Sequence, residues 1–233
     1  MRDGCPSAHP SRRATFTPMN ADRGHSTPAP AGGFEEIVAQ LLAGVPRQGR
    51  TLVAIDGVRA SGKSTFAAQR AHRIDTRPLI RLARDDFFNP AAIRHARADS
   101  PRRASGSTRT TLRASGDGLD RPASYDRASG ETVEPEQVQA SPDARVLVEG
   151  TFLHRDQLAP LWDYSIFLDV PFQETAWRMA QRDGLEPENL LLDRYTGGQR
   201  LYFASAAPWD RASLVIDVHR PKIINASAAS PAP

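Results

Sequence analysis

One stretch of the sequence combines glycines, a lysine and hydroxyl side chains at a spacing suited to binding phosphate. Residues 53–67 read VAIDGVRASGKSTFA, and within them Gly57-x-x-x-x-Gly62-Lys63-Ser64 is a complete P-loop pattern. Lys63 is one of only two lysines in the chain. In this pattern the lysine reaches the β- and γ-phosphates and the serine hydroxyl contacts Mg²⁺. The residues therefore predict a site for ATP and Mg²⁺.

The loop between the two glycines is expected to supply further phosphate contacts. Backbone N–H groups of residues 59–64 would surround phosphate oxygens at the amino terminus of the following helix. The predicted nucleotide-binding set is Gly57, Arg59, Ala60, Ser61, Gly62, Lys63, Ser64 and Thr65.

Carboxylates follow two of the apolar runs that flank this loop. Glu149 comes directly after RVLV, and Asp85 and Asp86 follow LIRLA in the sequence LARDDFFNP. At the carboxyl edge of a parallel sheet, Glu149 would hold Mg²⁺ or its waters, and the aspartate pair would supply a general base for a hydroxyl acceptor. The candidate metal ligands are Ser64, Glu149 and Asp85. The alternatives are an ordinary strand-end acid for Glu149 and solvated loop carboxylates for Asp85 and Asp86.

Two arginines four residues apart could complete a phosphoryl-transfer site. Arg178 and Arg182 lie in VPFQETAWRMAQRDG, where a helix is expected after Pro171, so both share one face. Guanidinium groups on one face can stabilise the charge of a transferring phosphoryl group. We therefore count both as catalytic candidates, against the alternative of a solvated basic face.

The elements that would position these residues alternate between apolar runs and helical patterns. The predicted strands cover residues 51–55, 79–83, 145–148, 164–170 and 213–218, and helices are expected over 35–42 and 63–72. Continuous apolar runs that alternate with helices are typical of a parallel sheet covered on both faces. We predict an α/β three-layer sandwich with a five-stranded parallel sheet.

The length fits one domain with flexible ends. We predict a disordered extension over residues 1–33, a domain over 34–224 and a disordered tail over 225–233, because the ends are rich in Pro, Ser and Ala without apolar periodicity. No run approaches 18 apolar residues, and the first 30 residues lack the apolar core of a secretory signal. We expect a cytoplasmic protein that does not enter a membrane.

Residues 94–142 interrupt the periodicity. The stretch from 94 to 114 holds six arginines and one aspartate, although the whole chain has a formal charge of only +3. Nucleic-acid binding needs basic charge along a folded face, so this single Ser/Gly-rich stretch is weak evidence for it. We therefore expect a small-molecule partner and no nucleic acid, and the sequence leaves open a monomer or a homo-oligomer. His154 is interpreted as a packing or surface residue.

At these motifs the sequence resembles the uridine kinase-like family of P-loop kinases, in its actinobacterial form. The likeness spans about residues 51–223 and includes GVRASGKST, RDDFF, PASYD, VEGTFL, RMAQRD and the closing pattern RYTGGQRLYFASAAPWDRASLVID. The resemblance implies that Asp85 takes the proton of the sugar hydroxyl, that Ser64 and Glu149 hold Mg²⁺, and that a lid over 178–198 closes on the phosphates. It further implies acceptor contacts from Asp86, Phe88, Tyr125 and Asp126.

The sequence departs from the family after RDDFF. Where such kinases carry a segment of the type Ser-Pro-x-Gly-Phe-Trp-x-Asp-Ser-Tyr-Asp, this chain reads DSPRRASGSTRTTLRASGDG. Residues 103–111 can be encoded by codons that, in a reading frame shifted to start at the third base, encode Gly-Phe-Trp-Leu-Asp-Ser-Tyr-Asp. A local frameshift is therefore one hypothesis, a flexible family-variable loop is the other, and sequencing the gene across residues 99–126 decides between them.

The combined expectation is an ATP- and Mg²⁺-dependent kinase that phosphorylates a hydroxyl of a nucleoside or related small metabolite. The alternative is a P-loop protein that binds nucleotide with impaired or no transfer, because the acceptor-side segment is anomalous. A GTPase switch is disfavoured, since no Asn-Lys-x-Asp motif occurs.

Overall fold

Six strands form the central sheet, in the order β2-β5-β1-β6-β7-β8. The computed structural model describes residues 39–40, 43–74, 77–87, 119–120, 123, 125–126, 129–136, 138–139, 141–192, 194–218 and 222–226. The strands are β1 (Thr51–Gly57), β2 (Leu79–Ala83), β5 (Arg145–Gly150), β6 (Tyr164–Asp169), β7 (Leu214–Asp217) and β8 (Lys222–Ala226). The first five of these are parallel, which confirms the predicted five-stranded sheet, and β8 adds an antiparallel strand at the β7 edge.

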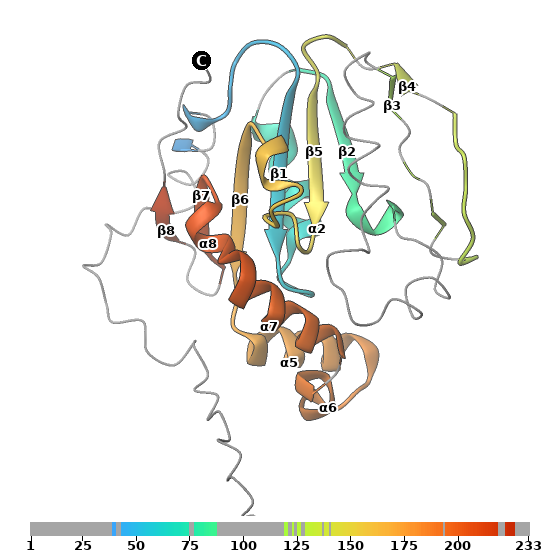
Figure 1. The fold of residues 1–233 in the computed structure, drawn as a ribbon, viewed down its shortest axis with the longest axis vertical. Helices are drawn as coiled ribbons and strands as arrows, with labels where there is room; N and C mark the ends of the chain where they lie inside the picture. The colour runs from blue at the N-terminus through green and yellow to red at the C-terminus, as the bar shows by residue number, and fades with distance from the viewer. Residues whose placement is uncertain are drawn as a thin grey trace, which may run out of the picture.

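The register of the central strands brings their carboxyl ends to one level. Glu149 on β5 pairs with Ile55 on β1 and with Ala83 on β2. The residues that follow β1, β2 and β5 therefore meet at one edge of the sheet. In Figure 1 this edge lies at the end where the arrows point, beside helices α5, α6 and α7.

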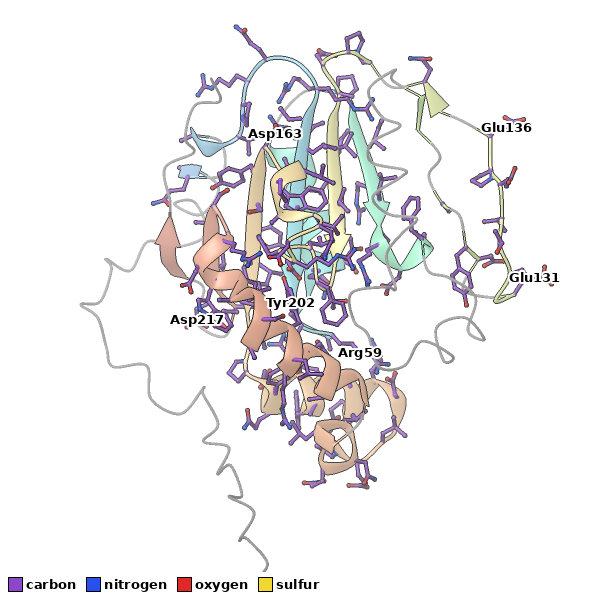
Figure 2. The ribbon with its side chains drawn as sticks, viewed as in Figure 1. Arg59, Glu131, Glu136, Asp163, Tyr202 and Asp217 are labelled. Atoms are coloured by element: carbon purple, nitrogen blue, oxygen red, sulfur yellow. The ribbon has the colours of Figure 1, made fainter. Side chains whose placement is uncertain are left out.

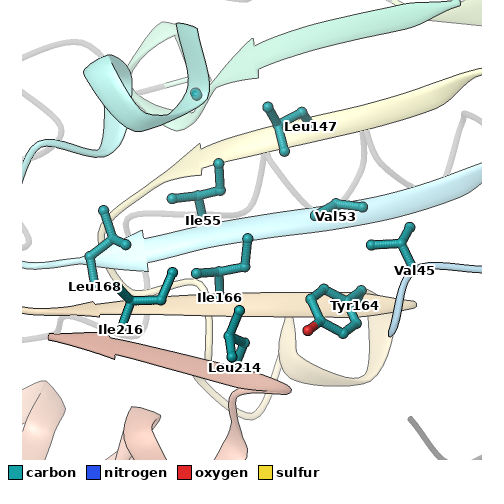
Figure 3. Packing of buried hydrophobic residues seen from close by; sticks show 10 residues of the cluster. Val45, Val53, Ile55, Leu147, Tyr164, Ile166, Leu168, Leu214 and Ile216 are labelled. Carbon is teal, nitrogen blue, oxygen red and sulfur yellow. The ribbon is translucent and has the colours of Figure 1, made fainter. Parts of the chain in front are cut away.

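One face of the sheet packs against α2 (Lys63–Ile74), the helix predicted to follow the glycine loop. Alternate strand residues such as Val53, Ile55 and Ile166 are fully buried together with Ala67 of this helix. Figure 3 shows Val53, Ile55 and Ile166 side by side across neighbouring strands. Burying each of them contributes about 1.5–3 kcal/mol, so this face anchors the strand and the helix on either side of the loop.

The opposite face packs against α7 (Arg194–Ala206) and α8 (Pro208–Arg211). Phe167, the next residue after Ile166, points to this side and makes edge contacts with Phe203 and Trp209. The alternation along β6 therefore separates two cores, with α2 behind the sheet and α7 in front of it in Figure 1.

Helices α5 (Phe172–Asp183) and α6 (Pro187–Leu192) form a small layer beyond the strand ends. Helix α5 begins after Pro171 and ends at Gly184, which adopts φ 67° and donates its N–H to the carbonyl of Ala180. Met179 and Leu190 are buried between the two helices. Together with the start of α7, this layer occupies the predicted lid over 178–198.

The region after β2 contains little regular structure within its described part. The 3₁₀ turn η1 (Arg84–Phe87) follows β2, and two-residue strands β3 (Leu119–Asp120) and β4 (Val138–Gln139) pair with each other. The predicted extension over 1–33, most of the predicted helix over 35–42 and the arginine-rich stretch over 94–114 lie outside the described residues. Strand β8 continues two residues beyond the predicted domain end at 224. Among the helices that the structure describes, none has the length and apolarity to cross a bilayer.

Candidate active site

The phosphate loop joins β1 to α2 through two residues with positive φ angles. Gly62 has φ 91°, a value that favours glycine, and Ala60 has φ 58°. The helix starts at Lys63, and its first backbone bond runs from the N–H of Phe66 to the carbonyl of Gly62 at 2.8 Å. The strand, loop and helix that the P-loop pattern predicted are therefore all present.

Two of the predicted phosphate donors already have partners inside the protein. The N–H of Arg59 donates to Oε1 of Gln199 at 2.7 Å, and the N–H of Ser61 donates to the carbonyl of Val58 at 3.1 Å. The first turn of α2 begins at Lys63, where N–H groups have no intrahelical acceptors. Of the predicted phosphate-binding N–H groups in residues 59–64, we therefore expect those at the start of α2 to make the main contacts.

The ammonium group of Lys63 lies folded back over the loop. Its Nζ donates to the carbonyls of Gly57 and Val58 at 3.1 and 2.8 Å. Burial lowers the pKa of Lys63, and the carboxylates of Asp56, Glu149 and Asp85 oppose that shift. The cation is thus held among carboxylates at the strand ends, which is where a nucleotide's terminal phosphates would require it.

Ser64 and Glu149 meet as the metal prediction requires. The hydroxyl of Ser64 donates to Oε2 of Glu149 at 2.8 Å, across 85 positions of the sequence. Hard oxygen donors of this kind suit Mg²⁺, which usually takes one or two protein ligands and completes its shell with phosphate oxygens and water. No cluster of three or more His, Cys, Asp or Glu side chains suited to a metal occurs within the described ranges, so a metal here would depend on such outside ligands.

The two aspartates after β2 occupy the turn η1. Asp85 lies close enough to Lys63 to affect its pKa, and the carbonyl of Asp86 accepts the N–H of Tyr125 at 2.9 Å. Tyr125 is buried, so the predicted acceptor-side residues Asp86 and Tyr125 are neighbours. Asp126 instead accepts the hydroxyl of Ser129 within a tight turn.

Two predicted site residues remain, Phe88 and Thr65. Phe88 lies outside the described residues. Thr65 is exposed on the first turn of α2.

The two lid arginines have different partners. Arg178 donates to Glu174 at 2.8 Å and to the carbonyl of Ala60 in the phosphate loop at 3.5 Å. Arg182 makes two bonds to Asp183, at 2.7 and 2.8 Å, and its side chain is 60% exposed. Of the two predicted arginines, only Arg178 contacts the loop in this structure.

A buried network that the sequence did not reveal lies beneath the loop. Asp56, the residue before Gly57, is fully buried and accepts hydrogen bonds from His154 Nδ1 at 2.9 Å and from Tyr202 Oη at 2.5 Å. Its other oxygen accepts the N–H of Gly57 at 2.7 Å. Burial alone would raise the pKa of Asp56, but its bonds to His154, Tyr202 and Gly57 hold it below the usual value.

The same network ties α7 to the strand ends. Tyr202 and Gln199 lie one turn apart on α7, and both are buried. Figure 2 shows Tyr202 beside the ends of the central strands, with Arg59 in the adjacent loop. The sequence motif GGQRLY, which belongs to the resemblance, contains both residues and was the one available indication of their role.

Comparison with protein-family profiles and with curated proteins finds no match. Among solved structures, the chain is similar to a possible uridine kinase from Bacillus stearothermophilus, with 19% identity and a TM-score of 0.60 over 78% of this chain and 96% of that one. It is also similar to a candidate fructose transport system kinase from Silicibacter sp. TM1040, with 23% identity and a TM-score of 0.61 over 73% of this chain and 94% of the other. The sheet order, the glycine loop and these likenesses agree, and the chain has the α/β fold of the P-loop kinases.

Proposed function

We propose that this protein is a uridine kinase-like enzyme that transfers the γ-phosphoryl group of ATP, with Mg²⁺, to a hydroxyl of a nucleoside or related small metabolite. The observation that carries the proposal is the contact between Ser64 and Glu149 at 2.8 Å, beside Lys63 and at the start of α2. The hydroxyl and the carboxylate that would hold the metal, and the lysine that would bind phosphate, come together there from two segments of the chain.

The phosphate side of the site would act by positioning and by charge stabilisation. Lys63 already points its ammonium group over the loop, and it would exchange carbonyl partners for phosphate oxygens. Arg178 reaches the same loop from α5, so its guanidinium could follow the lid onto the transferring group. These cations oppose the negative charge of the nucleotide without taking part in bond changes.

The acceptor side would supply a base. Asp85 would take the proton of the attacking hydroxyl while the bond from the γ-phosphorus to the ADP oxygen breaks and ADP leaves. Mg²⁺ held by Ser64 and Glu149 would neutralise charge on the β- and γ-phosphate oxygens. Asp86 and Tyr125, which are joined through their backbones, would border the acceptor.

The test is Mg²⁺-dependent release of ADP from ATP, measured across uridine, cytidine, other nucleosides, pantothenate, and hydroxy acids and sugar phosphates with their uncharged parents. Acceptor-dependent release that disappears in Lys63→Ala supports the proposal and identifies the substrate. ATP binding with no acceptor-dependent release rejects it and favours the alternative, a P-loop protein that binds nucleotide without transfer. We expect the protein to act in the cytoplasm on a small molecule.

A further inference from the structure

A buried arginine near Asp56 and Tyr202 has no hydrogen-bond partner among the described residues. Arg155 follows β5, and only 7% of its surface is exposed. Its Nε, Nη1 and Nη2 atoms are all screened from solvent, and none forms a hydrogen bond with the described part of the chain. A guanidinium in such a position has lost its water without gaining an acceptor, which is costly for a charged group.

A second buried guanidinium, that of Arg84, lies near enough to lower the pKa of Arg155. Arg84 is only 2% exposed, and its Nη1 donates to the hydroxyl of Thr151 at 3.4 Å. Its guanidinium carbon lies 5.4 Å from the centre of the Phe152 ring. Gly150 permits this approach, because a Cβ there would lie 2.4 Å from the Cβ of Arg84. The loop after β5 is thus built to hold Arg84 close to the strand ends.

Asp56, the buried acid that attracts Arg155, already accepts several hydrogen bonds. Asp56 attracts Arg155, yet its oxygens accept bonds from Gly57, Leu153, His154 and Tyr202. Burial lowers the pKa of Arg155 to about 9, and repulsion from Arg84 acts in the same direction. Arg155 therefore remains a cation at neutral pH. Among the charged groups that affect its pKa, the largest effect comes from another cation, Arg84.

One member of this arginine pair is adjacent in sequence to the residue proposed to activate the acceptor. Arg84 directly precedes Asp85, the proposed base, on the turn η1. Arg84 also lies near enough to Lys63 to lower its pKa. An oxyanion at Arg155 and Arg84 would meet donors already stripped of water, and guanidinium groups bind carboxylates and phosphates through two parallel bonds.

We propose that Arg155 and Arg84 form an oxyanion subsite on the acceptor side, so that the preferred acceptor is a hydroxyl compound that also carries a carboxylate or a phosphate. This inference rests on the proposed function and narrows it, because a neutral nucleoside would leave the subsite unfilled. The oxyanion forms no covalent bond there. It orients the acceptor so that its hydroxyl faces Asp85.

The first experiment measures binding without turnover. The protein is loaded with Mg²⁺ and a non-hydrolysable ATP analogue, so that the phosphate loop is filled, and its melting temperature is followed against inorganic phosphate, acetate, and chloride at equal ionic strength. We expect phosphate or acetate to stabilise the wild type beyond chloride, which distinguishes a phosphate from a carboxylate subsite. In Arg155→Gln we expect the affinity to fall by about tenfold or more.

The matched control is Arg81→Gln, which removes an exposed arginine on β2, three residues before Arg84. It should respond to the anions as the wild type does. Without anions, Arg155→Gln should melt at or above the wild-type temperature, because it removes a buried cation that has no acceptor. Equal anion responses in wild type and Arg155→Gln, or no response in either, would overturn the subsite. A clear fall in the anion-free melting temperature would also overturn it, by showing that Arg155 already has a partner within the fold.

The second experiment separates this inference from the proposed function. Acceptors are supplied in matched pairs that differ in one anionic group, such as a sugar phosphate and its parent sugar, or a hydroxy acid and its amide. If the wild type prefers the anionic member and Arg155→Gln loses this preference, both the subsite and the kinase activity are supported. Equal use of charged and neutral members contradicts the subsite and leaves the kinase intact. Arg155-dependent anion binding with no phosphorylation of any acceptor supports the subsite and rejects the kinase.

Discussion

The side-chain oxygen of Gln199 accepts the backbone N–H of Arg59 at 2.7 Å, although 140 positions separate the two residues. The bond joins α7 to the phosphate loop, and Gln199 is only 4% exposed. The loop conformation therefore depends on a residue of α7 that lies just beyond the predicted lid in sequence. A nucleotide that reshapes the loop must preserve or replace this bond.

Gln199→Ala is expected to weaken nucleotide binding. Loss of the acceptor leaves a loop N–H unsatisfied at a cost of about 1–3 kcal/mol, and 1.4 kcal/mol corresponds to about tenfold in affinity. Calorimetric titration with ATP measures the change. Gln181→Ala, which removes an exposed glutamine of α5, is the matched control. An unchanged ATP affinity in Gln199→Ala would show that the loop holds its shape without α7.

The two lid arginines are expected to differ in importance. Arg178 contacts the carbonyl of Ala60, whereas Arg182 is paired with its neighbour Asp183. Arg178→Ala should lower the rate of ADP release by about a hundredfold, as loss of a group that stabilises transition-state charge does. Arg182→Ala should cause a smaller loss. Equal losses in the two variants, in kcat at saturating ATP, would contradict this ranking and show that Arg182 leaves Asp183 when the lid closes.

Tyr202→Phe tests the network beneath the loop. The hydroxyl of Tyr202 donates to the buried carboxylate of Asp56, and a hydrogen bond to a charged group contributes about 1.5–3 kcal/mol. Urea unfolding at pH 7 should show a loss of that size. Tyr164→Phe is the control, because Tyr164 is also buried but its hydroxyl forms no hydrogen bond with the residues described. Equal stability of Tyr202→Phe and the wild type would show that the Asp56 network does not stabilise the loop.

The same network sets a direction for the pH dependence of stability. The folded-state pKa of Asp56 lies below its ordinary value of 3.8. Its contribution is therefore complete above that value and is lost as the pH falls through the lower, folded pKa. Because Tyr202→Phe removes one of the bonds that lower this pKa, its acid-unfolding midpoint should lie at higher pH than that of the wild type. A lower midpoint would contradict the assignment.

Glu149→Gln is expected to raise the Mg²⁺ requirement. The neutral amide keeps the shape of the side chain but loses the charge that would attract the metal beside Ser64. We expect the Mg²⁺ concentration for half-maximal ADP release to rise about tenfold or more, while the melting temperature without metal stays nearly constant because Ser64 is exposed. Glu136→Gln, at an exposed position far from the site in Figure 2, is the control. An unchanged Mg²⁺ requirement would exclude Glu149 as a ligand.

The sequence predicted those parts of the site that depend on local pattern. The glycine spacing placed Lys63 at the start of a helix, and apolar runs placed Glu149 and Asp85 at strand ends. Since parallel strands share one carboxyl edge, the formation of the sheet brings these residues to the same edge. Ser64 does contact Glu149 there.

The parts that sequence reasoning missed depend on contacts between distant segments. Asp56 is an ordinary polar residue at the end of an apolar run, and its partner Tyr202 is 146 positions away. His154 was expected to be a packing or surface residue, and burial is correct, but its bond to Asp56 follows only from the fold. Arg182 shared a helix face with Arg178, yet its neighbour Asp183 supplied a closer partner.

The most direct test of the proposed function follows the phosphoryl group itself. Phosphorus NMR of ATP, Mg²⁺ and the best acceptor should show a new phosphoester as the γ-phosphate signal declines, with the wild type and with Arg81→Gln. Asp85→Asn should bind ATP normally but form the phosphoester at least about a hundredfold more slowly, because it lacks the base that takes the hydroxyl proton. Wild-type rates in Asp85→Asn, or conversion of ATP to ADP and free phosphate with no phosphoester in the wild type, would contradict phosphoryl transfer to an acceptor at this site.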